Sequence, residues 1–311
     1  MQNQPERRQR FKRSHGRVQL TPDDLAIIDH IRRHRFLRST HLVRLLPHRP
    51  PKKLIERLGA LFHAGYLDRP RAQLDYYARA GSAPMVHGLG DRSQALVTVL
   101  PNLEWATKGR DLKRPYIEHA LMVADIMVAI EIAARDREDI EFVAGEQLLA
   151  FKARPDKSHA WKLSADLLVG RERHSVTLIP DAVFALRSRA TGRYACFFLE
   201  ADRGTMPVDR ADLSQTSIRR KLLAYEAALK ARQHVERFAF HNLRILTVTS
   251  SFERLRSMIA ALNAVTHGMA TGRFLFAKHP AMTGADPLSL LWTTNGAPAR
   301  IDTPLRAIIP T

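Results

Sequence analysis

The stretch that decides the fold of this chain, residues 178–205, reads LIPDAVFALRSRATGRYACFFLEADRGT. Two apolar runs flank a polar turn at 189–192, and this pattern predicts an antiparallel β-hairpin. The two predicted strands also carry three acids, Asp181, Glu200 and Asp202. A carboxylate inside an apolar strand is costly unless it is paired with a cation or binds a metal ion, so these acids require a structural reason.

The predicted turn decides which residues of the two strands face each other. With its centre near 190–191, paired residues have numbers that add to about 381, which places Asp181 opposite Glu200. Opposed side chains of a hairpin lie about 5 Å apart. Because side chains alternate along a strand, Glu200 and Asp202 share one face. The three acids are therefore expected to converge.

Clustered carboxylates repel one another unless a cation joins them, and an oxygen-only ligand set favours Mg²⁺ or Mn²⁺. Such an ion, held by Asp181 and Glu200, lowers the pKa of a bound water and binds a scissile phosphate. Glu146, at the end of an earlier element, is a further candidate ligand. Two alternatives stay open: an inactive remnant of a metal site, and ion pairs with neighbouring arginines such as Arg203.

The net charge of the chain indicates its partners. The 311 residues are 45% hydrophobic and 26% charged, an ordinary globular balance, and they suffice for two domains. The net charge of +18, with a pI of about 10.7, attracts polyanions, foremost nucleic acid and less strongly an anionic membrane surface. Residues 1–80 hold 18 Lys and Arg against 7 Asp and Glu, or +11 of the +18, which favours a dedicated basic module.

Several classes of protein are excluded by composition. The single cysteine, Cys196, rules out an internal disulfide and a cysteine-based zinc site. The N-terminus lacks the apolar core of a secretory signal, and no apolar run approaches the roughly 18 residues that span a bilayer. A cytoplasmic protein without a membrane partner is expected.

The first hundred residues predict a basic arm followed by a winged helix-turn-helix. Residues 1–20 are polar and basic and are expected to form a disordered arm. Residues 21–100 contain three predicted helices, of which the first is capped by Thr21 and the third ends at Gly65. Ser39 or Thr40 is the expected cap of the second helix. Strands at 66–67 and 76–77 then suggest a hairpin, and a further strand and helix follow at 85–97.

In a winged helix the third helix, here beginning near Pro51, enters the major groove of DNA. The candidate DNA-binding residues are the basic side chains near its start, on its outer face and in the wing: Arg49, Lys52, Lys53, Arg57, Arg69 and Arg71. A winged helix that makes only protein contacts is the alternative, but the concentration of positive charge on this module favours DNA.

A polar linker at 101–114 separates this module from a second domain, residues 115–280, and residues 281–311 are expected to be an irregular tail. The second domain combines the hairpin with predicted strands at 140–143, 244–249 and 274–276 and with helices at about 115–135 and 214–232. Residues 152–164 are expected to be a loop, and Ser250 with Glu253 predicts the capping box of a last helix. The chain is thus expected to have an α/β (α+β) fold, with a mixed sheet flanked by helices.

Two phrases of the hairpin carry a family resemblance: Pro180-Asp181 before Val183-Phe184, and the run from Glu200 to Thr205. They resemble the replication-relaxation family of plasmid and mobile-element proteins, over roughly residues 20–280. The resemblance implies an N-terminal winged helix and a C-terminal domain like the PD-(D/E)xK restriction-endonuclease fold. It also implies that Asp181 and Glu200 are metal ligands, with Glu146 matching an early acid of the pattern.

The nuclease pattern also calls for a lysine two residues after the glutamate, where this chain has Asp202. Some branches of that superfamily carry the lysine on the following helix, and Lys221 is the candidate there, since it flanks an apolar stripe. The candidate catalytic set is therefore Asp181, Glu200, Asp202 and Lys221. A solvated surface lysine is the alternative interpretation of Lys221, and Arg203 is the alternative cation.

Three functions are consistent with these observations. The first is a DNA-binding protein of a plasmid or mobile element that acts in replication initiation, relaxation or mobilisation, with an accessory or inactive nuclease-like domain. The second is an active Mg²⁺- or Mn²⁺-dependent DNA endonuclease or nickase targeted by the winged helix. The third is a transcriptional regulator, which leaves the acids unexplained. Double-stranded DNA is the expected partner; a homodimer and replication or mobilisation proteins stay open as protein partners.

Overall fold

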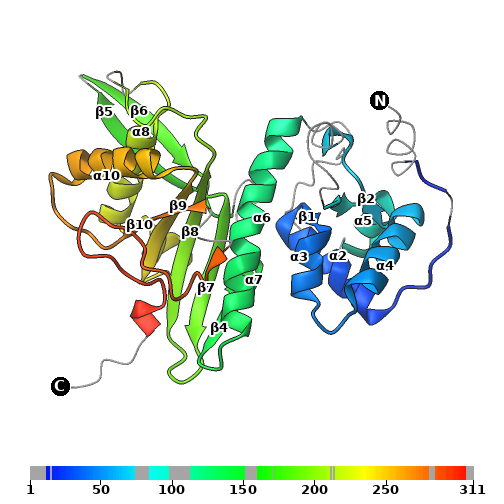
Figure 1. Ribbon diagram of the computed structural model, residues 1–311. Helices are drawn as coiled ribbons and strands as arrows, with labels where there is room; N and C mark the ends of the chain where they lie inside the picture. The colour runs from blue at the N-terminus through cyan, green and yellow to red at the C-terminus, as the bar shows by residue number, and fades with distance from the viewer. Residues whose placement is uncertain are drawn as a thin grey trace. The chain divides into compact units, whose positions relative to one another are not determined.

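The computed structural model describes residues 12–14, 16–73, 84–97, 113–150, 160–169, 171–210, 212, 214–279 and 284–305 (Figure 1). The chain divides into two compact units, residues 1–128 and 129–311. Helices and sheets are mixed throughout, so the protein has the α+β fold that the sequence predicts. Within the described ranges, none of the helices has the length and apolar content that crossing a bilayer requires.

The first unit is built from helices and very short strands, in the order α2 (Pro22–His34), β1 (Leu37–Arg38), α3 (Ser39–Leu45), α4 (Pro51–His63), β2 (Leu67–Asp68), β3 (Val86–Leu89) and α5 (Asp91–Val97). The strands form a three-stranded antiparallel sheet in the order β1-β3-β2. The three predicted helices are present, and a long helix, α6 (Arg114–Arg135), begins in this unit.

One local prediction for the first unit is wrong, and another stays untested. Leu67 of β2 pairs with Leu89 of β3, so the strand after α4 joins the 86–89 segment. The predicted partner, 76–77, lies outside the described residues. The N-cap of α3 is Arg38, because the helix already begins at Ser39.

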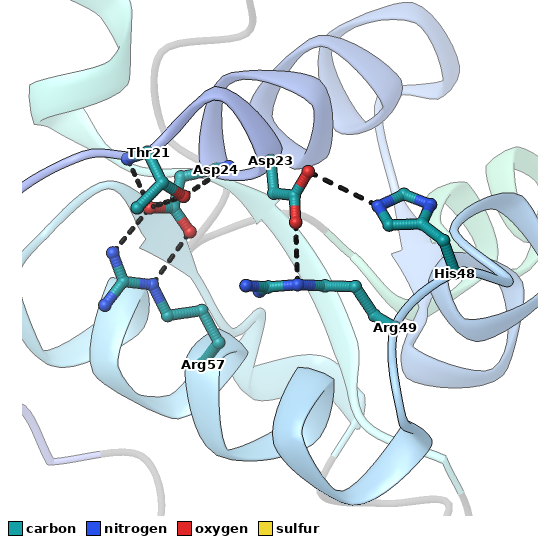
Figure 2. A network of polar contacts seen from close by, with 6 residues as sticks. All are labelled: Thr21, Asp23, Asp24, His48, Arg49 and Arg57. Atoms are coloured by element: carbon teal, nitrogen blue, oxygen red, sulfur yellow. Dashed lines mark hydrogen bonds and ion pairs between the residues drawn. The ribbon is translucent and has the colours of Figure 1, made fainter.

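The first turn of α2 is fixed by a capping box and by a cation from α4 (Figure 2). The backbone N–H of Thr21 donates to Oδ2 of Asp24 at 2.8 Å, and the N–H of Asp24 donates back to Oγ1 of Thr21 at 3.4 Å. Asp24 is fully buried, and Arg57 of α4 donates to both of its carboxylate oxygens, from Nε at 2.8 Å. The acid thus joins two helices of the unit.

The end of the basic arm lies against α4 and β2, which differs from the expected disorder. Arg13 donates to the Leu67 carbonyl at 2.9 Å and forms an ion pair with Asp68 at 3.2 Å. The N–H of Ser14 donates to Nδ1 of His63 at 3.1 Å. Residues 1–11 and residue 15 lie outside the described part, so the prediction for them stays untested.

The second unit contains a five-stranded mixed sheet in the order β10-β9-β8-β7-β4. Its strands are β4 (Ile140–Ala144), β7 (Ala182–Ser188), β8 (Tyr194–Asp202), β9 (Leu243–Thr249) and β10 (Phe274–Lys278). Its helices are α7 (Gly145–Ala150), α8 (Ile218–Lys230), α9 (Gln233–Phe238) and α10 (Phe252–Thr266), and α8 and α10 lie together over one face of the sheet (Figure 1).

The predicted hairpin is β7 and β8, with the predicted register. Ala182 pairs with Leu199 and Val183 with Phe198, so the positions of Asp181 and Glu200 come next in the same ladder. The N–H of Asp181 donates to the carbonyl of Leu199 at 2.9 Å, which extends the pairing beyond the strand.

Three features of the second unit differ from the sequence-based expectations. A two-stranded sheet of β5 (Leu163–Val169) and β6 (Glu172–Leu178) packs on α8, where only a loop to 164 was expected. The side chain of Ser251, rather than Ser250, caps α10. In the tail, Trp292 is fully buried next to a bridge between Phe276 and Thr293, and a short 3₁₀ helix, η2 (Thr303–Leu305), follows.

Candidate functional site

The acids of the hairpin face the helices because of strand alternation. Cys196 and Phe198 of β8 belong to the core that contains the buried residues of α8 and α10. Glu200 and Asp202 continue the same alternation toward the end of β8, so they lie on the helix-covered face. Val183 of β7 belongs to that core too, which places the preceding odd-numbered Asp181 on the same face.

Glu200 is held by two side chains of α8. Lys221 Nζ forms an ion pair with Oε2, and the hydroxyl of Tyr225 donates to Oε1. Glu200 is only 6% exposed and Tyr225 1% exposed. Lys221 and Tyr225 are one helical turn apart, so both reach the same carboxylate. Lys221 is thus not the solvated surface lysine of the alternative interpretation.

The pKa values of this group reflect burial and neighbouring charge. Burial raises the pKa of Glu200, and the charge of Asp181 adds to the rise, while Lys221 and Tyr225 oppose it. Burial alone lowers the pKa of Lys221, but the charges of Glu200 and Asp181 raise it above its ordinary value. Lys221 is therefore protonated at neutral pH. Further positive charge near Asp181 and Glu200 would stabilise their ionised forms.

Asp181 and Glu146 approach the same edge of the sheet from different elements. Oδ2 of Asp181 accepts a hydrogen bond from the N–H of Ala201 at 2.8 Å, which fixes the carboxylate beside the end of β8. At the start of α7, a Cβ on Gly145 would lie 2.7 Å from the carbonyl oxygen of Val183, so the helix begins directly against the first residues of strand β7. Glu146, the next residue, is half-buried there.

Asp202 has a different set of partners from Glu200. Arg254 of α10 donates to both of its oxygens, from Nη2 to Oδ1 at 2.7 Å and from Nε to Oδ2. Oδ2 also accepts from the hydroxyl of Thr249 at 2.6 Å. Asp202 is thus neutralised by an arginine, and its side chain belongs to the junction of β8, β9 and α10.

The sequence-based prediction did not include Arg254 in the site. The available signal was indirect: β9 is a parallel neighbour of β8 with Asp202 beside Thr249, and Arg254 follows on the first turn of the next helix. Finding it from sequence requires the strand pairing, which is not local in the chain.

The donor set around Glu200 fits a hard divalent cation. Asp181 and Glu200 supply carboxylate oxygens, the ligands that Mg²⁺ and Mn²⁺ prefer. Glu146 does not join them in a group of three described residues whose ligand atoms lie within 4.8 Å of one another. Each carboxylate oxygen has two lone pairs, so the hydrogen bonds from Lys221 and Tyr225 leave acceptor capacity on Glu200. The ligand atoms of Asp181 and Glu200 are therefore of the type that a divalent cation prefers.

The predicted DNA-binding residues divide into two groups in the first unit. Lys52, Lys53 and Arg71 are exposed. The other three, Arg49, Arg57 and Arg69, hold protein partners: Arg49 pairs with Asp23 at 2.7 Å, Arg57 pairs with Asp24, and the guanidinium of Arg69 lies 4.2 Å from the ring centre of Phe62. The first group faces solvent on and near α4, and within it Lys53 lies 3.8 Å from a carboxylate oxygen of the exposed Glu56.

Comparison with known proteins gives one match. A family model described as Replication-relaxation matches residues 28–242, which is more than half of the chain. The matched region includes the predicted third helix of the first unit and the Asp181, Glu200 and Lys221 positions of the second. No curated protein and no solved structure matches the chain.

Proposed function

Because the chain belongs to the replication-relaxation family, we propose that it nicks the DNA of a plasmid or mobile element at a metal-dependent site formed around Asp181 and Glu200. The family suggests a role in plasmid or mobile-element replication or relaxation. Relaxation of a supercoiled plasmid requires a break in at least one strand. The observation that carries the proposal is the ion pair between Lys221 and Glu200, which supplies the cation that Asp202 cannot supply.

In this proposal Asp181 and Glu200 hold the divalent ion, and Glu146 would have to move to join them. When bound, the ion would supply charge stabilisation at the scissile phosphate and activate water for hydrolysis. Lys221 would contact a phosphate oxygen, because its ammonium group is a compact, protonated donor beside the acids. Tyr225 keeps the Glu200 carboxylate oriented through its hydroxyl.

The first unit would deliver the site to DNA as a winged helix. Its element order, with α4 in the third helical position followed by short antiparallel strands, supports this assignment. Lys52 and Lys53 lie at the exposed start of α4, and Arg71 lies beyond β2. These side chains would contact phosphates of the duplex, and positive charge of this kind gives salt-sensitive binding.

A second candidate is a DNA-binding protein whose nuclease-like domain is an inactive remnant. The observation that favours it is Asp202, which occupies the usual lysine position and is neutralised by Arg254. In that case duplex binding is the whole activity, and the Lys221–Glu200 pair only neutralises a buried acid.

Nicking of supercoiled plasmid in Mg²⁺ or Mn²⁺ separates the two candidates. Under the proposal the wild-type chain converts supercoiled plasmid to open circles, and Asp181→Asn and Glu200→Gln each reduce the rate by about 100-fold or more. Asp166→Asn, which changes an exposed acid of β5, is the matched control and retains the wild-type rate. No metal-dependent nicking by the wild type, or equal nicking by all variants, would reject the proposal.

A further inference from the structure

We infer that Asp202 and Arg254 are positioning residues: together they hold the start of α8, and thereby Lys221, against Glu200. The inference rests on the proposed function and changes the role of Asp202, which the sequence placed among the catalytic candidates. It is carried by a continuous series of contacts from the end of β8 to the first turn of α8.

The first contacts join the ends of two strands to α10. Asp202 accepts from Arg254 at both oxygens and from Thr249 at 2.6 Å. Asp202 is 8% exposed, and the Arg254 side chain 16% exposed. A bidentate hydrogen bond from a guanidinium, together with one from a hydroxyl, fixes the orientation of the carboxylate.

The second contacts join this anchor to the segment that leads into α8. Nη2 of Arg254, which already binds Asp202, also donates to the carbonyl of Met206. One residue further on, the carbonyl of Pro207 accepts from the N–H of Ile218, the first residue of α8, at 3.0 Å. The backbone around 206–207 is thus fixed by Arg254 on one side and satisfies the first turn of α8 on the other.

The chain bends between these contacts. The N–H of Gly204 donates to Oδ1 of Asp202 at 3.3 Å, and Gly204 has a φ of +84°, which favours glycine. A Cβ at this position would lie 3.4 Å from Oγ of Ser250. The turn after β8 therefore depends on Asp202 for its conformation and brings the following segment back to Arg254.

Lys221 lies on the first turn of α8, three residues after Ile218, so any shift of the start of α8 moves its ammonium group relative to Glu200. Displacements of about 1 Å at a catalytic group can cost about 100-fold in rate. The ion pair with Glu200 of β8 depends on the position of the start of α8. The Asp202–Arg254 pair links the end of β8 to the segment before α8 and so helps to fix that position.

Arg254→Lys tests the inference, because it keeps the charge but loses the two-pronged contact and cannot reach Asp202 and Met206 together. We expect single-turnover nicking to fall by about 10- to 100-fold with the Kd for DNA unchanged. Asp202→Asn is the second variant, since it removes the charge and keeps one acceptor. Arg256→Lys, an exposed change on the same helix, is the matched control.

A second readout does not depend on nicking. Brief acetylation with acetic anhydride, followed by peptide mass spectrometry, compares Lys221 with Lys230 at the other end of α8. Both variants should raise the acetylation of Lys221 severalfold relative to Lys230, while thermal melts show a folded chain. An unchanged Lys221 to Lys230 ratio, or full nicking by Arg254→Lys, would overturn the inference.

These results also distinguish failure of the inference from failure of the proposed function. If the wild type does not nick, the proposed function fails and the acetylation ratio alone decides whether Arg254 positions Lys221. If the wild type nicks and both variants match it, the site is active and the positioning role is wrong.

Discussion

Two buried carboxylates, Asp24 in α2 and Glu200 in β8, are each bound by a cation from another element, yet their pKa values move in opposite directions. Burial raises the pKa of both. For Asp24, hydrogen bonds from Arg57 and Thr21 and the charge of Arg57 outweigh burial and lower the pKa. For Glu200, burial and the charge of Asp181 prevail and raise it. Asp24 is thus stabilised as a charged carboxylate by its hydrogen bonds and by Arg57, whereas at Glu200 the effect of burial exceeds that of the ion pair with Lys221.

Asp24→Asn is predicted to destabilise the first unit by about 3 kcal/mol at pH 7, because it removes a buried partner of Arg57. Since the folded pKa of Asp24 is lowered, its contribution is complete above the unfolded value of about 3.9 and is lost as pH falls through the folded pKa. Hydrogen exchange of the α2 and α4 amides, measured against pH, checks both points.

Asp23→Asn is the matched control for that prediction. Asp23 is the neighbouring acid, 34% exposed, and pairs with Arg49 and His48 (Figure 2). Partly exposed pairs of this kind contribute about 1 kcal/mol or less. Equal losses of protection in the two variants, or a loss for Asp24→Asn that persists at the lowest pH, would contradict the assigned role of Asp24.

At the scale of elements, the segment after α4 packs backbone to backbone against the connection between β3 and α5. A Cβ on Gly90, between β3 and α5, would lie 2.3 Å from the carbonyl oxygen of Gly65 and 2.9 Å from that of Leu67. Both obstacles are backbone atoms, so neither can move aside alone. Gly65 itself has a φ of +84°, as a C-terminal helix stop requires.

Gly90→Ala is therefore predicted to destabilise the first unit by about 2 kcal/mol or more, through overpacking and loss of the β2–β3 pairing. Gly59→Ala is the contrasting variant. It lies inside α4, and its new Cβ would only make ordinary contact with the Arg69 side chain at 3.7 Å. It should stabilise the unit by up to about 1 kcal/mol. Urea unfolding of both variants checks the opposite signs.

The elements predicted well are those with a strong local signal. The register of β7 and β8 follows from one turn and one alternation, and α2 and α4 follow from Thr21, Pro51 and Gly65. The β5–β6 hairpin also carries alternating apolar residues, at 163, 165 and 167, and could have been found. The pairing of β2 with β3 had no such signal, because a two-residue strand shows no period.

The site shows the same division between local and distant information. The convergence of Asp181 and Glu200, and the stripe on α8 beside Lys221, follow from local periodicity. The role of Tyr225 and the partnership of Arg254 with Asp202 depend on how α8 and α10 pack on the sheet. No spacing within the sequence encodes that packing, so these contacts emerged only with the structure.

At the scale of the whole molecule, the excess positive charge and the candidate site lie in different units. Residues 1–80 carry +11 of the net charge of +18, whereas the half-buried Asp181 and the buried Glu200 and Asp202 lie in the second unit. This division suits a protein in which one unit provides affinity for duplex DNA and the other acts on a phosphate. Under the proposed function, Lys221 would substitute for the lysine absent at position 202.

The most direct test of this account is single-turnover nicking of supercoiled plasmid in Mg²⁺ or Mn²⁺ by Lys221→Ala, with Lys230→Ala as the control from the exposed end of the same helix. We predict that Lys221→Ala loses about 100-fold or more in rate with DNA binding retained, while Lys230→Ala matches the wild type. Equal nicking by Lys221→Ala and the wild type would contradict the account.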